Sequence, residues 1–202
     1  LEHALWQLVT GGITPGRRLQ AFRQYVSLAE SEQAAAQLYQ IWEKRELEGK
    51  PLSERDEINL SYQLAIRLPE KADEIVNEQL KRISNPDRQA EYRFISPSVS
   101  PRKEVRDSVF EALLVADNRR IEPWASTALS LLNHRLRETE SVEYIRPALE
   151  ILEEVQRTGD IFFPTAWLRA LLGGHSSVQA RDEVEAFYAE YPDFPEMLLN
   201  KI

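Results

Sequence analysis

The sequence predicts an all-α fold: a superhelical α-solenoid of about eleven short antiparallel helices, without a β-sheet. Three observations predict it. Apolar residues recur at the spacing of a helix in nearly every segment of the 202 residues. A capping Ser or Thr, or a Pro, stands where most of these apolar stripes begin. The connections between stripes are mostly brief, which favours helices packed in succession.

Helix starts in the first half of the chain carry a cap, a proline or both: Thr14 with Pro15, Ser31, Ser53, Pro69, and Asn85 with Pro86. An apolar stripe follows each start, as burial of one helix face requires. An earlier helix is expected to end at Gly11 and Gly12, and residues 49–51, Gly-Lys-Pro, are expected to form a turn.

Residues 96–101, Ser-Pro-Ser-Val-Ser-Pro, predict the clearest loop of the chain, which could divide it into two halves. The helical pattern resumes at once, so we interpret residues 1–202 as one superhelical domain. The chain begins at Leu1 rather than Met and stops within an expected helix, so we expect it to be excised from a longer protein. Later helix starts are expected at Pro101, Pro123, Ser141 (with a kink at Pro147), Pro164, Ser176 (with Gln179 as a capping box) and Pro195.

The most aromatic stretch is residues 156–176. A helix is expected to end at Gly159, and Pro164 is expected to open the next helix, which runs to Leu172 before two glycines. Three large rings lie close together here and should be buried. We therefore predict a packing keystone formed by Gly159, Phe162, Phe163, Pro164 and Trp167.

Composition excludes several classes of function. A net charge of −8 argues against a nucleic-acid partner, which needs a basic face. The absence of Cys excludes disulfides, thiolate chemistry and Cys-based zinc sites. No apolar run is long enough to span a membrane. The absence of Cys does not fix the compartment.

Motifs for chemistry are missing from the chain. None of its three histidines has a second His four residues away, so the helical zinc motif His-Glu-x-x-His is absent. We interpret His134 as a helix-end residue and His175 as a turn residue. A site joining the two is an unsupported alternative. The Gly pairs lack the spacing of a phosphate loop, and we expect no catalytic residue, metal ligand or cofactor in this chain.

Basic residues are the remaining candidates for binding. Arg119 and Arg120 lie between two expected helices, and Arg137 follows the next one. On one rim or the concave face of a solenoid they could bind a carboxylate-bearing ligand. The alternative is ordinary surface pairing with neighbouring carboxylates.

Residues 157–164, Arg-Thr-Gly-Asp-Ile-Phe-Phe-Pro, are followed by Trp-Leu at 167–168 and Leu-Gly-Gly at 172–174. With residues 118–119, Trp124, 128–134, 136–137, 144–147 and 149–150, this pattern resembles the C-terminal helical domain of bacterial aminopeptidase N-like zinc aminopeptidases. The resemblance is most specific over residues 102–202.

The resemblance implies a domain of HEAT- or armadillo-like helix pairs that does not itself catalyse. It would pack on a thermolysin-like zinc domain, its partner in the full-length protein, and enclose the cavity that admits the peptide. Arg119, Arg120 or Arg137 would then line that cavity. In the related leukotriene-hydrolase branch, basic residues after a comparable Gly bind a substrate carboxylate. This chain has Asp160 and Phe162 at those positions, so no carboxylate-binding site is expected there.

Two hypotheses follow. The first is the substrate-enclosing domain of a zinc aminopeptidase, with zinc in the missing catalytic domain. The second is a freestanding helical-repeat scaffold that binds a protein partner, because concave solenoid surfaces commonly do so.

Overall fold

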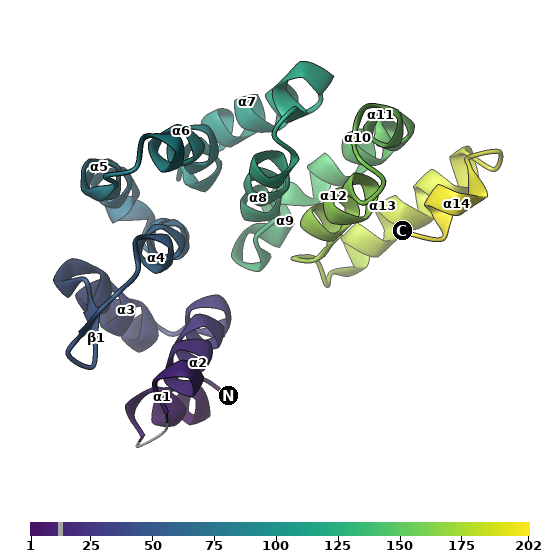
Figure 1. Ribbon diagram of the computed structural model, residues 1–202. Coiled ribbons are helices and arrows are strands. Elements are labelled where there is room, and N and C mark those ends of the chain that lie inside the picture. Colours follow the sequence, from purple (N-terminus) through teal and green to yellow (C-terminus); the bar gives the residue numbers. More distant parts are fainter. Residues whose placement is uncertain (12–13) are drawn as a thin grey trace. The chain divides into compact units, whose positions relative to one another are not determined.

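The computed structural model describes residues 1–11 and 14–202 (Figure 1). Their regular secondary structure is helical apart from one two-stranded sheet, which confirms the all-α class. They form two compact units, Leu1–Tyr92 and Arg93–Ile202. The boundary falls within helix α6, shortly before residues 96–101, and the prediction of a single superhelical domain stays a prediction.

The first unit holds these elements: α1 (Glu2–Thr10), α2 (Pro15–Leu28), α3 (Glu32–Lys44), β1 (Glu46–Leu47), β2 (Lys50–Pro51), α4 (Glu54–Arg67), the 3₁₀ helix η1 (Pro69–Lys71), α5 (Ala72–Arg82) and most of α6 (Pro86–Ile95). Within this unit α1 packs against α2, α3 against α4, and α4 against α5 (Figure 1). These three pairs of consecutive helices are therefore neighbours.

The expected helix starts of the first unit are largely confirmed. The Oγ atoms of Ser31 and Ser53 accept hydrogen bonds from the backbone N–H groups of Ala34 and Asp56, each at 3.2 Å. Thr14 precedes α2 without such a side-chain bond. Pro69 opens a 3₁₀ turn rather than α5 itself. Helix α1 ends at Gly11 as expected, while Gly12 lies outside the described residues.

The prediction of no sheet is wrong at residues 46–51. Strands β1 and β2 pair antiparallel around Glu48 and Gly49, whose φ angles of 50° and 72° are those of a tight hairpin turn. Gly tolerates positive φ without a steric penalty, and this favours a hairpin where the sequence suggested only a turn. Leu47 of β1 is buried and anchors the hairpin on the core.

The core of the first unit lies between α1–α5 and the hairpin. Its buried side chains include Phe22, Tyr25, Leu38, Trp42, Leu47, Leu60, Leu64 and Ile75. Trp42 donates its indole N–H to Oε1 of the buried Gln79 at 2.7 Å, and the guanidinium of Arg82 lies 4.2 Å from the Trp42 ring centroid. A buried indole N–H needs a polar partner, and here the partner comes from another helix. These contacts therefore join α3 to α5.

The second unit holds the end of α6 and these elements: η2 (Ser96–Val99), α7 (Lys103–Leu113), η3 (Ala116–Arg119), α8 (Glu122–Leu132), η4 (Arg135–Arg137), α9 (Glu138–Ser141), η5 (Val142–Tyr144), α10 (Ile145–Glu150), α11 (Leu152–Thr158), α12 (Phe163–Leu172), α13 (Val178–Glu190) and α14 (Glu196–Leu199). Helix α8 packs against α12, and α10 against α13. Its core includes Leu129, Ile145, Leu149, Trp167, Leu171 and Phe187.

Most of the loop expected at residues 96–101 is a 3₁₀ helix, and Ser98, Val99 and Ser100 of this segment are buried. Two arginines hold it. The Arg106 guanidinium donates to the carbonyls of Ser100 at 2.8 Å and Pro101 at 3.0 Å, and Arg137 donates to that of Val99 at 2.9 Å. The sequence could not show this, because the arginines come from α7 and η4.

Two other helix boundaries differ from the sequence prediction. The helix expected from Ser141 is divided into η5, α10 and α11, and Ser141 ends α9 instead of starting a helix. Ser177, not Ser176, caps α13: its Oγ accepts the backbone N–H of Ala180 at 3.3 Å. Ser176 instead donates its backbone N–H to Glu138 at 2.8 Å.

Candidate functional site

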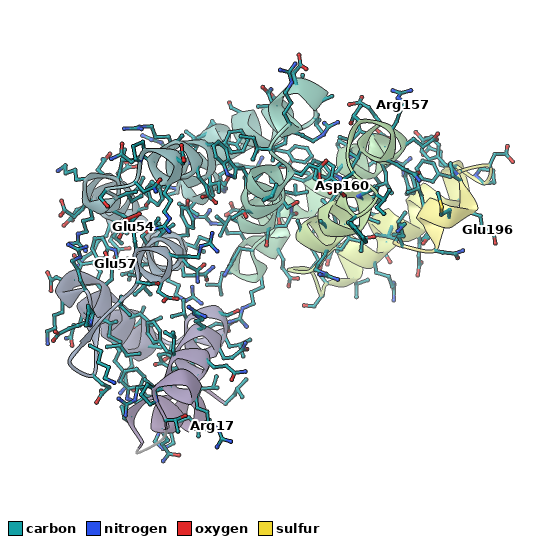
Figure 2. All side chains as sticks on the ribbon, in the orientation of Figure 1. Arg17, Glu54, Glu57, Arg157, Asp160 and Glu196 are labelled. Atoms are coloured by element: carbon teal, nitrogen blue, oxygen red, sulfur yellow. The ribbon has the colours of Figure 1, made fainter. Side chains whose placement is uncertain are left out.

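The turn between α11 and α12 is built around Asp160. Its Oδ1 accepts the backbone N–H groups of Phe162 at 2.7 Å and Phe163 at 2.9 Å. Its own backbone N–H donates to Oε1 of Glu122 at 2.8 Å. A carboxylate that accepts these N–H groups satisfies the free donors at the start of α12, as a capping residue does. Figure 2 shows Asp160 and Arg157 at this turn.

Gly159 ends α11 as expected. Glycine is required here because a side chain would have no space. Its backbone is extended, with φ −105° and ψ −179°, rather than left-handed. A Cβ there would overlap the Phe163 ring and stand 2.9 Å from Oε1 of Glu122. Only a residue without a side chain therefore fits between the ring and the carboxylate.

Trp167 is the centre of the predicted keystone and is fully buried. Its indole N–H donates to the Ala148 carbonyl at 3.1 Å, and its ring meets that of Phe163 edge-on at a centroid distance of 6.0 Å. Helix α12 is thereby fixed to α10. Pro164 lies in the first turn of α12 and is buried as well.

The expectation of a buried Phe162 is wrong. Its side chain is 72% exposed, and that of the neighbouring Ile161 is 80% exposed. The hydrogen bonds to Asp160 set the turn so that Phe163 enters the core while Ile161 and Phe162 face solvent. We call these two residues the apolar turn.

Arg119 is buried next to the keystone. It donates to the Leu113 carbonyl at 2.7 Å and to Oε1 of Glu154 at 2.5 Å, and its guanidinium lies 5.5 Å from the Trp167 ring centroid. Such a buried charge needs these partners. Arg119 thereby joins η3, α11 and α12.

The other two candidate arginines differ from each other in burial. Arg120 is 76% exposed and pairs with Asp117 at 2.7 Å. Arg137 is buried against η2, and burial together with the nearby charge of Arg106 lowers its pKa to about 10. The three candidate arginines have different partners in the described chain, and their role in binding a peptide stays a prediction.

His175 and His134 lie at the end of α8. Nε2 of His175 is 2.9 Å from Oδ1 of Asn133, and Nδ1 of His134 accepts the backbone N–H of Leu136 at 3.2 Å. Burial lowers the pKa of His175, although the charge of Glu138 opposes this. Among residues 1–11 and 14–202, no group of three or more His, Asp or Glu side chains is placed to hold a metal ion.

A hollow of about 250 Å³ lies in the first unit, beside the hairpin. Leu19 of α2 and Leu47, Pro51 and Leu52 of the hairpin region give it an apolar wall. Arg18 and Lys50 line it with positive charge, and Ser53 and Asp56 complete it at the start of α4.

No known family, curated protein or solved structure matches this chain. The geometry above is therefore the basis for assigning function. In the described part of the chain, no helix is long and apolar enough to cross a membrane.

Sequence reasoning missed both the apolar turn and the hollow. The sequence does predict two segments that line the hollow, namely the start of α2 at Thr14 and the turn at residues 49–51. They are more than thirty residues apart in the sequence, and only the packing of α2 on α4 brings them together.

Proposed function

We propose that this chain is the non-catalytic, C-terminal helical domain of a zinc aminopeptidase of the aminopeptidase N kind. It packs on the catalytic domain and encloses the cavity that admits the peptide. The zinc ion and its ligands belong to that catalytic domain.

The apolar turn carries the proposal. Residues 157–164 hold the sequence resemblance, and within them Ile161 and Phe162 are large apolar side chains that face solvent. Contiguous exposed apolar side chains are a feature of surfaces that another domain covers. Asp160, Gly159 and the buried Phe163 hold that turn in place.

The helix order supports a HEAT- or armadillo-like superhelix within this proposal. In the first unit, α1 packs on α2, α3 on α4 and α4 on α5, as neighbouring helices do in stacked helix pairs. Such a solenoid offers a long wall for a chamber, which suits a domain that encloses a peptide.

The coding sequence upstream of Leu1 tests the proposal most directly. We expect it to encode His-Glu-x-x-His with a further Glu, within a few hundred residues. The intact protein should then bind zinc in stoichiometric amount and hydrolyse amino-acid p-nitroanilides. Absence of the zinc motif would contradict the peptidase proposal and favour the alternative, a freestanding interaction scaffold.

Substitutions in the intact protein test the apolar turn. Replacing Ile161 and Phe162 with Ser should weaken packing on the catalytic domain, seen as faster hydrogen exchange at residues 157–164 and reduced peptidase activity. Met197→Ser, at a side chain 60% exposed, is the control. Equal effects of the control and the double variant would contradict a docking role for this turn.

A further inference from the structure

The hollow beside the hairpin has firmly placed walls. Arg23 of α2 donates to both oxygens of Asp56 at 2.8 and 3.2 Å, and Ser53 donates to the same carboxylate at 2.6 Å. Burial opposes ionisation of Asp56, but these hydrogen bonds outweigh it and keep its pKa below the ordinary value. The bidentate pair joins the α2 wall to the α4 wall.

The charge that faces the hollow is positive. The carboxylate of Asp56 is neutralised by Arg23, which leaves Arg18 and Lys50 as the unbalanced charges. Within the described residues, no hydrogen bond or ion pair involves the ammonium group of Lys50, which is exposed.

Arg18 holds hydrogen-bonding capacity that the described chain does not use. Its Nη2 donates to the Gly11 carbonyl at a long 3.3 Å. Its Nε is shielded from water and has no acceptor among residues 1–11 and 14–202. A guanidinium whose donors lack acceptors is matched best by a carboxylate, which can accept two parallel hydrogen bonds.

We propose that this hollow binds a small carboxylate with an apolar body. The body packs on Leu19, Leu47 and Leu52, and the carboxylate pairs with Arg18 and Lys50. The volume of about 250 Å³ suits a body the size of one large side chain. Since none of the lining residues belongs to the apolar turn, the site does not depend on the proposed peptidase role.

Calorimetric titration of the intact protein with 3-phenylpropanoate tests the proposal, and 3-phenylpropanamide serves as the uncharged control. We expect the acid to bind at least about tenfold more tightly than the amide, because hydrogen bonds between charged groups are the stronger ones. Hydrogen exchange should slow at residues 47–56 when the acid binds. Equal binding of acid and amide, or no binding, overturns the proposal.

A neighbouring pair of arginines provides a matched control. Arg18→Met should weaken acid binding at least about tenfold, whereas Arg17→Met, on the same helix but outside the hollow, should change it less than about twofold. Figure 2 labels Arg17, which is exposed. Equal losses in the two variants overturn the proposal. If Arg18→Met does not fold, Lys50→Met with Lys81→Met as its control makes the same comparison.

The carboxylate could belong to a free acid or to the end of a peptide. Titration with Ala-Ala-Phe and with its C-terminal amide separates these sources. Tighter binding of the peptide acid than of 3-phenylpropanoate assigns the hollow to peptide ends. Tighter binding of 3-phenylpropanoate assigns it to free acids. Failure of both acids to bind overturns the proposal.

Discussion

At the scale of single residues, the adjacent side chains of Phe162 and Phe163 differ sharply in burial. Phe163 and Trp167 are buried, while Phe162 is exposed. Trp167→Ala should lower the free energy of unfolding by roughly 3–5 kcal/mol, because it leaves a large cavity and an unpaired Ala148 carbonyl. Phe162→Ala is the matched control and should cost less than about 0.5 kcal/mol in the isolated chain. Urea unfolding measures both, and equal costs would show that Trp167 is no keystone.

His175 should make stability depend on pH. Its pKa is lowered in the folded state, so the unfolded chain takes up the proton first as the pH falls. The stabilisation is therefore complete above about pH 6.5, the ordinary His value, and is lost as the pH falls through the folded pKa. Urea midpoints measured between pH 7.5 and 5 should show this decline.

His175→Gln should make that decline shallower, because Gln keeps a polar partner for Asn133 and does not titrate. His3→Gln, at an exposed position, should leave the decline unchanged. A pH dependence that survives in His175→Gln would assign it to other groups.

At the scale of elements, helix starts fall into those with a capping bond and those without. Ser53 caps α4 and also binds Asp56, whereas Thr14 makes no side-chain cap bond to α2. Ser53→Ala should cost about 1–2 kcal/mol, and Thr14→Ala much less. Thermal unfolding followed by circular dichroism compares them, and a larger loss for Thr14→Ala would contradict this account of the caps.

At the scale of the whole molecule, the two hydrophobic cores are separate. One is built from residues of Leu1–Tyr92 and the other from residues of Arg93–Ile202. Leu38→Ala should therefore speed hydrogen exchange in the first unit, and Leu129→Ala in the second, each by creating a cavity in one core. Mass spectrometry of exchanged peptides distinguishes the units. Uniform acceleration across both would indicate a single cooperative molecule.

The sequence alone determined the helical class, because apolar periodicity and caps act within a few residues of each other. It located most helix starts, including those at Ser31, Ser53 and Pro164, for the same local reason. It also predicted that a helix ends at Gly159. Glycine is needed there because Phe163 and Glu122 approach the backbone closely, and not because the backbone is left-handed.

Only the tertiary structure decided which side chains face inward. Phe162 and Phe163 are chemically identical neighbours, but only Phe163 packs against Trp167 in the core, whereas Phe162 is exposed. Arg119 and Arg137 look like surface charges in the sequence, but both are buried. Arg119 donates to the carboxylate of Glu154, and Arg137 donates to the carbonyl of Val99, so each has a partner more than thirty residues away. The hollow beside the hairpin arises in the same way, since its walls are joined by an ion pair between residues 33 positions apart.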